Sequence, residues 1–274
     1  VLTKPDPVDM NAIVGTHDLA LIVLDTLRYD VAVEELVEGR TPNLAKLLPG
    51  GWEKRHSPGT FTYAAHAAFF AGFLPTPAQP GRHRRRLALG FEGSETIGDG
   101  TCVLEGATIV EGLAARGYHT LCVGGVGFFN LRNPLGNVLP GLFAERHWDR
   151  STSVTDPASF ENQIAIVERS LGALPAERRA FTFVNVSALH QPNHFYLDGA
   201  PDTRDTRDTR ASHAAALRYV DRHVPRLVAA LSRHGRAFVI VCSDHGTLYG
   251  EDGYVDHRVA HPIVTTVPYA EVLL

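Results

Sequence analysis

Residues 216–246 read ALRYVDRHVPRLVAALSRHGRAFVIVCSDHG, and this stretch indicates a helix followed directly by a buried strand. Apolar residues recur every three or four positions, which predicts an amphipathic helix over 212–234 that Pro225 kinks or splits. The next run, AFVIVCSD (237–244), is almost wholly apolar and ends in an acid. A continuous apolar run of this length is typical of a strand buried on both faces of a parallel sheet.

The same alternation of helix and buried strand extends along most of the chain. Residues 125–155 are rich in Gly, Pro and Asn and are predicted to form a loop. Alternating strands and helices predict an α/β fold, with a mostly parallel central sheet and helices on both faces. Further strands are predicted at 18–25, 118–125 and 181–189, and further helices at 41–48, 57–75, 107–116 and 158–174.

The length and composition indicate one domain. The chain has 274 residues, of which 44% are hydrophobic, and this is enough for a single sizeable core. We expect one domain over 1–274, with residues 1–15 as an N-terminal extension that lacks the apolar core of a secretion signal. The repeat DTRDTRDTR (202–210) predicts a solvated, charged, low-complexity loop.

Charge and cysteine content exclude several classes of partner. The chain carries 26 basic and 30 acidic residues, so nothing indicates a nucleic-acid or membrane partner. No run of about 18 apolar residues occurs that would predict a membrane-spanning helix. The three cysteines, Cys102, Cys122 and Cys242, are scattered and form no CxxC pair. We therefore expect reduced thiols and a cytoplasmic location.

Acids and histidines follow several of the predicted strands. Asp25 ends one strand, Asp244 and His245 end another, and the polar segment 187–194 follows a third. The carboxyl ends of parallel strands share one edge of the sheet, so we expect these groups to converge there. Carboxylate and imidazole donors suit Zn²⁺ or Mn²⁺. Taken alone, Asp25 is equally compatible with a turn acid or a helix cap.

The chain has 14 histidines, and two pairs of them are further candidate ligands. His190 and His194 lie four positions apart in a segment that Pro192 keeps from being a continuous helix. His257 and His261 precede another apolar stretch. Each of the four is either a metal ligand or an ordinary surface histidine.

Thr62 is the candidate nucleophile, and it lies at the start of a predicted helix. Unpaired N–H groups and the positive end of the helix dipole favour an anion there. A hydroxyl beside a divalent cation in such a place can be ionised and attack phosphorus or sulfur. The alternative is an ordinary helix-capping threonine, and Thr60 is the nearest competitor for the catalytic role.

Three stretches together resemble the alkaline phosphatase/sulfatase superfamily, and the resemblance covers most of the chain. LIVLDTLRYD (21–30) resembles the first metal-binding strand, and FTYAAHAAFFAGFLP (61–75) resembles the nucleophile helix of the sulfatase-like branch. Residues 216–246 resemble the helix, strand and Asp-His-Gly ligand pair of the same branch. The resemblance implies an alkaline phosphatase-like catalytic domain over 1–274.

The resemblance also assigns roles to individual residues. It implies that Asp25, Asp244 and His245 bind a metal together with Thr62 as nucleophile. Arg28 matches a frequent companion of the first metal-binding acid, and His66 matches a basic position on the nucleophile helix.

A second metal site is implied less completely. Phosphatase-like members use an Asp-x-x-x-His pair and a later His, and here His190 stands where the Asp is expected. His194 matches the His of the pair, and His261 is preferred to His257 as the later ligand. So histidine-rich a site favours zinc, with manganese as the alternative, and the resemblance implies two divalent ions in all.

The resemblance, with a threonine in the nucleophile position, implies a metal-dependent hydrolase of a small-molecule phosphate or phosphonate ester. The substrate is a phosphomonoester, a phosphodiester or a phosphonate, and the reaction passes through a phospho-threonine at Thr62, with Arg28 or His66 contacting the non-bridging oxygens. Sulfatases of the family use a Cys or Ser that is oxidised to an aldehyde, and Thr62 cannot be. Three alternatives stay open: a phosphoryl transferase or mutase on the same site, a sulfatase-like relative, and a degenerate, non-catalytic binding protein.

Overall fold

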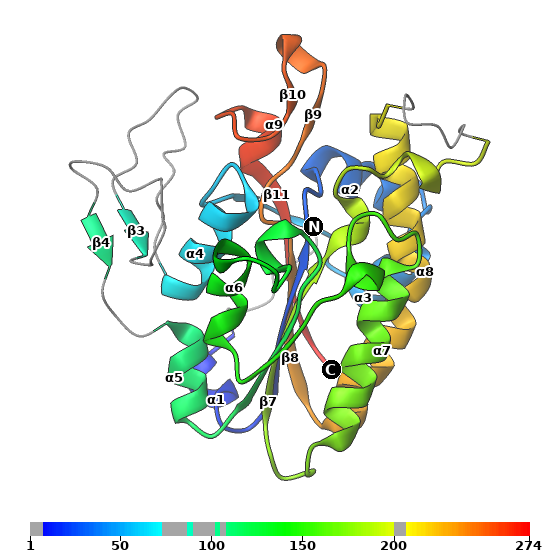
Figure 1. The fold of residues 1–274 in the computed structure, drawn as a ribbon. Helices are drawn as coiled ribbons and strands as arrows, with labels where there is room; N and C mark the ends of the chain where they lie inside the picture. The colour runs from blue at the N-terminus through cyan, green and yellow to red at the C-terminus, as the bar shows by residue number, and fades with distance from the viewer. Residues whose placement is uncertain (1–7, 73–86, 90–101, 105–107, 200–206) are drawn as a thin grey trace.

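A seven-stranded sheet forms the centre of the molecule, between two layers of helices (Figure 1). The computed structural model describes residues 8–72, 87–89, 102–104, 108–199 and 207–274. In sheet order the strands are β2 (Glu53–His56), β11 (Thr266–Leu273), β8 (Ala237–Cys242), β1 (Asp18–Leu24), β7 (Ala180–Val186), β5 (His119–Val123) and β6 (Glu145–His147). Two short pairs lie outside it, β9 (Leu248–Tyr249) with β10 (Val255–Asp256) and β3 (Leu87–Leu89) with β4 (Cys102–Leu104).

The strands are mostly parallel, as the alternation of helices and strands predicts. β1 pairs in parallel with both β7 and β8, and β5 pairs in parallel with β7 and β6. β11 runs antiparallel to both of its neighbours, β8 and β2. The carboxyl ends of β1, β7 and β8 therefore lie side by side at one edge.

Helices cover both faces of the sheet, which confirms the predicted layers. The helices are α1 (Met10–Ile13), α2 (Tyr29–Val37), α3 (Pro42–Leu47), α4 (Thr62–Ala71), α5 (Ile109–Ala115), α6 (Pro134–Val138), α7 (Ser159–Ala173), α8 (Arg210–His234) and α9 (Pro262–Thr265). α7 and α8 pack on one face, and α4 and α5 lie on the other (Figure 1). Successive side chains of a strand point to opposite faces, so β1 contributes Ile22 to one core and Val23 to the other.

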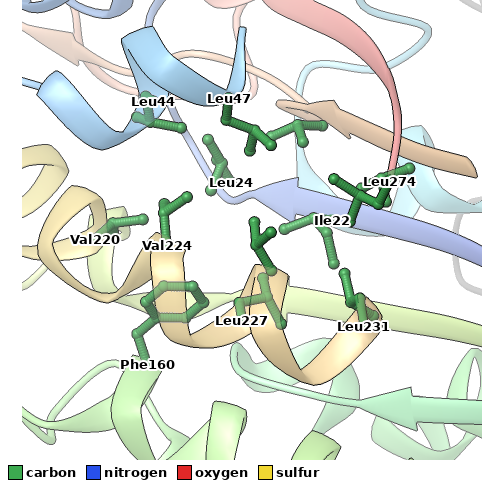
Figure 2. Close-up of a pocket in the computed structure, with 13 residues that line it drawn as sticks. Ile22, Leu24, Leu44, Leu47, Phe160, Val220, Val224, Leu227, Leu231 and Leu274 are labelled. Atoms are coloured by element: carbon green, nitrogen blue, oxygen red, sulfur yellow. The ribbon is translucent and has the colours of Figure 1, made fainter. Parts of the chain in front are cut away.

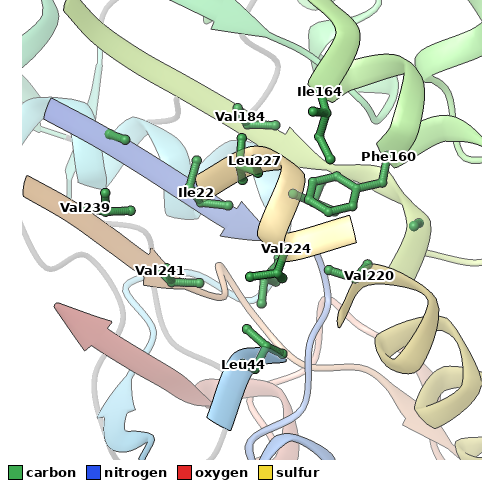
Figure 3. Close-up of a cluster of buried hydrophobic side chains, with 14 of the residues drawn as sticks. Ile22, Leu44, Phe160, Ile164, Val184, Val220, Val224, Leu227, Val239 and Val241 are labelled. Atoms are coloured by element: carbon green, nitrogen blue, oxygen red, sulfur yellow. The ribbon is translucent and has the colours of Figure 1, made fainter. Parts of the chain in front are cut away.

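A cluster of apolar side chains fills the core beneath the middle of α8. Ile22 and Val239 of the sheet face Val224 and Leu227 of α8, with Phe160 of α7 beside them (Figure 3). A cavity of about 30 Å³ remains within this layer, lined only by apolar side chains (Figure 2). A cavity that is apolar and this small offers no partners to a polar ligand, so we regard it as a gap in packing and not as a binding site.

The first turn of α3 is capped by a side chain from α8. Thr41 occupies the predicted N-cap position, but its hydroxyl makes no capping bond. The carboxylate of Asp221 instead accepts hydrogen bonds from the backbone N–H groups of Leu44 at 2.7 Å and Asn43 at 3.3 Å. The carboxylate thus satisfies helix donors that are otherwise unpaired.

Three local features differ from the sequence-based predictions. Residues 125–155 are not all loop, because they contain α6 and the edge strand β6, whose polar sequence gives no strand signal. Helix α8 runs unsplit through Pro225, since its apolar face stays packed on the sheet on both sides of the proline. Part of the expected N-terminal extension belongs to the fold, because Ile13 is buried in the core. Residues 202–206 of the expected charged loop lie outside the described ranges.

Candidate active site

Asp25 directly follows β1 and is completely buried. Its backbone N–H still donates to the carbonyl of Val186 at 3.2 Å, and the chain then turns at Thr26, whose φ of 63° is unusual for a β-branched residue. The side-chain amide of Asn185 donates to Asp25 Oδ2 at 2.8 Å. The other carboxylate oxygen, Oδ1, is buried without a hydrogen-bond partner.

Asp244 lies two residues after β8 and has the same half-satisfied character. Its Oδ1 accepts hydrogen bonds from the backbone N–H groups of Thr26 at 3.2 Å and His245 at 3.0 Å. Its Oδ2 is buried without a hydrogen-bond partner. Gly246 then lets the chain pass close to the α9 region, where an added Cβ would lie 2.1 Å from the Ile263 carbonyl oxygen. This close approach, and not a left-handed backbone, is what requires glycine here.

The ring of His245 has one nitrogen engaged and one turned to the acids. Nδ1 lies 2.9 Å from the carbonyl oxygen of Gly246, so Nδ1 carries the proton and donates it. Nε2 is left with its lone pair, 3.4 Å from Asp244 Oδ2. A backbone acceptor that fixes the tautomer in this way is the usual support of a metal-binding imidazole.

Thr62 is the first residue of α4, and its hydroxyl faces this group. Thr62 Oγ1 lies 3.3 Å from His245 Nε2 and 3.4 Å from Asp25 Oδ2. Phe61, with extended backbone, is the N-cap, so Thr62 stands among the unpaired N–H groups of a ten-residue helix. Thr60 is in the preceding turn, where its carbonyl oxygen accepts a bond from the backbone N–H of Arg258 at 2.8 Å.

Burial sets the protonation behaviour of these groups. It raises the pKa of Asp25 to about 6, and the nearby Asp244 carboxylate adds to the rise. Burial likewise raises the pKa of Asp244 to about 7 and lowers the pKa of the His245 imidazole. Two acids held together away from water are unfavourable as a pair of anions, and a bound cation removes that penalty.

The donor set fits a divalent cation. Asp25, Asp244 and His245 each offer one ligand atom, and these atoms lie within 4.8 Å of one another. Each acid presents an oxygen that has no other partner, and His245 presents an unprotonated nitrogen. Two carboxylates, an imidazole and a nearby hydroxyl are a set that Zn²⁺ or Mn²⁺ accepts.

Arg28 and His66, the predicted contacts to the phosphoryl oxygens, are both engaged elsewhere. The buried Arg28 guanidinium pairs with Asp30 at 2.8 Å and with Glu251. The ring of His66 donates from Nδ1 to the Thr62 carbonyl at 2.8 Å and packs among phenylalanines, and burial lowers its pKa to about 3. His66 is therefore a neutral core residue that supports α4.

Two of the candidate histidines lie in a row with His245, and two do not. The His257 ring stacks on His245 with centroids 4.5 Å apart, and His190 meets His257 edge-on at 5.7 Å. His194 instead lies 3.3 Å from Asp208. His261 bonds Asp252 through Nε2 at 3.1 Å and caps α9 through Nδ1. The structure thus brings His257, and not the preferred His261, to the site.

Two supporting residues escape the sequence-based prediction. Asn185 interrupts the apolar strand FTFVNV one residue before its end, and this polar intrusion was the available signal. Thr26 gives no such signal, because its left-handed backbone depends on the pairing of its N–H with Asp244, a contact between residues 218 positions apart.

The family model for sulfatases matches residues 17–269. The chain belongs to the sulfatase family. It is thereby placed in the alkaline phosphatase/sulfatase superfamily, as the sequence motifs predict. No curated protein matches significantly.

Solved structures share the fold at low sequence identity. The C-terminal periplasmic domain of phosphoethanolamine transferase EptC from Campylobacter jejuni superposes with a TM-score of 0.62 at 15% identity, over 94% of this chain and 80% of that one. EptC from Escherichia coli in complex with zinc gives 0.62 at 13%, over 94% and 73%. The lipoteichoic acid synthase LtaP from Listeria monocytogenes gives 0.57 at 13%, over 94% and 65%. At these identities the likeness concerns the fold.

The cellular location stays a prediction. Cys122 and Cys242 are free and buried, and within the described ranges no helix combines the length and apolar character that crossing a bilayer requires. Both EptC structures are described as periplasmic domains, so these relatives lend no support to a cytoplasmic location.

Proposed function

We propose that this protein is a metal-dependent enzyme that takes the phosphoryl group of a small phosphate or phosphonate ester onto Thr62 and then releases it to water. The observation that carries the proposal is the position of Thr62 Oγ1, within 3.4 Å of both His245 Nε2 and Asp25 Oδ2 at the start of α4. A hydroxyl placed beside candidate metal ligands at a helix start is the arrangement that an activated nucleophile requires.

Asp25, Asp244 and His245 would hold one divalent ion, zinc or manganese, beside the hydroxyl of Thr62. When bound, it would supply positive charge that lowers the pKa of the Thr62 hydroxyl and offsets charge on the phosphoryl oxygens. His190 and His257 are the side chains available for a second ion or for a substrate oxygen. His190 was expected from sequence, whereas His257 stands in place of the preferred His261, and His194 lies against Asp208.

The chain's own residues define the chemistry. Thr62 Oγ forms the new bond to phosphorus while the ester oxygen leaves with its bonding electrons and takes up a proton. The hydroxyl proton faces Asp25 Oδ2, and the free N–H groups of α4 face the anion. A water molecule then attacks the phospho-threonine, restores the hydroxyl and releases phosphate.

Transfer to an organic hydroxyl is the second candidate, because one of the similar structures, EptC from Campylobacter jejuni, is a phosphoethanolamine transferase. It shares the first half-reaction and differs only in the acceptor. Adding glycerol as a competing acceptor separates the two, since a transferase yields glycerol phosphate at the expense of inorganic phosphate.

The proposal is tested by metal analysis and a matched pair of esters. We expect close to one or two equivalents of zinc or manganese, and faster turnover of p-nitrophenyl phosphate, its methyl diester or a phosphonate ester than of p-nitrophenyl sulfate. Sulfatase activity without phosphoesterase activity would overturn the substrate class. A protein that binds no metal and turns over neither ester would be the non-catalytic relative.

A further inference from the structure

Once Arg28 and His66 are placed, neither of the two predicted side chains is available as a cation for the phosphoryl oxygens. Arg28 is neutralised by two carboxylates, and His66 is buried and uncharged. Any further positive side chain at the site has to come from another element.

Arg258 is such a side chain, and it lies against the segment that immediately precedes the nucleophile. It is exposed, and no carboxylate in the described part of the chain pairs with its guanidinium. The guanidinium carbon lies 5.9 Å from the ring centroid of Phe61, the residue immediately before Thr62. Its neighbour His257 stacks on His245. The side chain is therefore bordered on both sides by residues adjacent to the candidate ligands.

The backbone holds Arg258 in this place. Its N–H donates to the carbonyl of Thr60 at 2.8 Å, which links the segment after β10 to the turn before α4. Its φ of 73° is left-handed, a conformation that is unfavourable for a non-glycine residue. Strain of this kind persists only where surrounding contacts enforce it, and it gathers at ligand-binding sites.

Phe61 completes the subsite. Its ring is partly exposed and is supported by Phe128, with centroids 6.1 Å apart, and Phe128 in turn contacts Tyr63 at 5.6 Å. A guanidinium over an aromatic ring keeps its N–H edges free for anionic oxygens.

We propose that Arg258, held against Phe61, binds the non-bridging oxygens of the substrate phosphate and makes the site select phosphomonoester dianions over phosphodiester monoanions. The inference rests on the proposed function for the reaction, but the anion subsite itself does not require turnover. A monoester carries one more negative charge than a diester, so it gains more from an unpaired guanidinium.

The test compares Arg258→Ala with Arg236→Ala, an exposed arginine at the opposite end of β8. For Arg258→Ala we expect kcat/KM for p-nitrophenyl phosphate to fall about 10- to 100-fold and to fall about tenfold less for the methyl diester. Arg258→Lys keeps the charge but loses the forked geometry and should lie between. Arg236→Ala should leave both substrates unaffected.

A binding measurement separates this inference from the proposed function. The affinity for inorganic phosphate, measured by calorimetry on protein of equal metal content, should weaken in Arg258→Ala by a similar factor. If the wild type turns over no ester but phosphate binding still depends on Arg258, the subsite stands and the reaction does not. An unchanged monoester-to-diester ratio and unchanged phosphate affinity would overturn the subsite, as would an equal loss in Arg236→Ala.

A separate set of contacts assigns a positioning role to Asn185. Its Oδ1 accepts the backbone N–H of Val126 at 2.9 Å, so its amide nitrogen is the atom that must face Asp25. Gln163 holds the Asn185 carbonyl at 2.6 Å, and an added Cβ on Gly125 would lie 2.4 Å from the same oxygen. We infer that this network turns Asp25 so that Oδ1 stays free for the cation.

The control for Asn185→Ala is Thr120→Val. It removes a buried hydroxyl on β5 that accepts a hydrogen bond from the backbone N–H of Ala144. Asn185→Ala should weaken Mn²⁺ binding to the metal-free protein about 10- to 100-fold, whereas Thr120→Val should not. With metal saturating, kcat should fall while KM stays constant, because Asn185 does not touch the substrate. If the alanine variant does not fold, Asn185→Ser provides the same measurement. Wild-type Mn²⁺ affinity in either folded variant would refute the role.

Discussion

Strand β1 has a buried aspartate at each end, and the two differ in how their carboxylate oxygens are hydrogen-bonded. Asp18, at the amino end, has partners for both oxygens: the Ala180 N–H donates to Oδ1 at 2.8 Å, and His234 Nδ1 lies 2.7 Å from Oδ2. Asp25, at the carboxyl end, keeps Oδ1 unpaired although it is completely buried. A buried acid whose hydrogen bonds are all made supports the fold, whereas one left with a free oxygen is unfavourable until a ligand arrives.

The largest expected effect comes from removing the hydroxyl that distinguishes the carboxyl end. Thr62→Ala should reduce turnover of p-nitrophenyl phosphate at least about a thousandfold, because only the attacking atom is lost. Metal content and thermal unfolding should stay close to those of the wild type. Thr60→Ala is the matched control and should change the rate little, since Thr60 contributes its carbonyl and not its side chain. Near-normal turnover in Thr62→Ala would sink the assignment.

The difference between the two aspartates is tested most directly by replacing each of them with asparagine. Asp25→Asn should weaken Zn²⁺ or Mn²⁺ binding by roughly a hundredfold or more, because a charged ligand becomes a neutral amide. The metal-free variant should unfold at the same or a higher temperature than the metal-free wild type, since no hydrogen bond to Asp25 Oδ1 is lost. Competition titration and calorimetric unfolding measure the two quantities. A variant that loses stability but keeps its metal would place Asp25 with the structural acids.

Asp18→Asn should show the reverse pattern. It removes the charge that faces His234 and, at 3.6 Å, Arg179, and its amide cannot accept on both sides. We expect the free energy of unfolding in urea to fall by about 1–3 kcal/mol, with metal affinity unchanged. Altered metal binding without a loss of stability would contradict this division of roles.

The smallest effect concerns a satisfied acid at the far edge of the sheet, Glu145 of β6. Burial alone would raise its pKa, but hydrogen bonds from Ser170, His147 and His119 outweigh that and lower the pKa to about 2. The folded pKa lies below the unfolded value of 4.5, so its stabilisation is present above pH 4.5 and is lost as the pH falls towards 2.

Glu145→Gln isolates that contribution. At pH 5 the unfolding free energy of the wild type should exceed that of the variant by only about 1–2 kcal/mol, because solvent partly screens the Glu145 carboxylate. The difference should shrink by pH 3. Denaturation at the two pH values measures it. A difference that is constant between pH 3 and pH 5 would show that Glu145 acts through packing.

The sequence predicted the acids at strand ends well, and the loops poorly. Asp25 and Asp244 end apolar runs, and the geometry of a parallel sheet fixes where such residues meet. The position of Thr62 beside them was predictable for a similar reason, because a helix start has a defined direction. His194 and His261 lie apart from this group, because spacing along a loop does not determine which ring turns inward, and these two rings contact Asp208 and Asp252 instead.

Arg28 shows a second limit of sequence. Its identity suggested an anion contact, but a guanidinium binds whichever carboxylate the fold brings near it. Glu251 lies 223 positions away, so no local pattern announces the pairing. Conversely, Arg258 carries no motif, and only the fold, through the backbone bond to Thr60 and the contact with Phe61, reveals its place next to the segment before Thr62.

The Asp221 cap on α3 has a consequence for the order of folding. A short helix that caps itself can form transiently on its own, but α3 borrows its cap from a residue 177 positions further along the chain. Its first turn is therefore completed only when α8 docks, and loop closure over that distance is slow. The amide hydrogens of Asn43 and Leu44 should consequently exchange with solvent at a rate set by the opening of α8, so their exchange rates measure how firmly α8 is docked on α3.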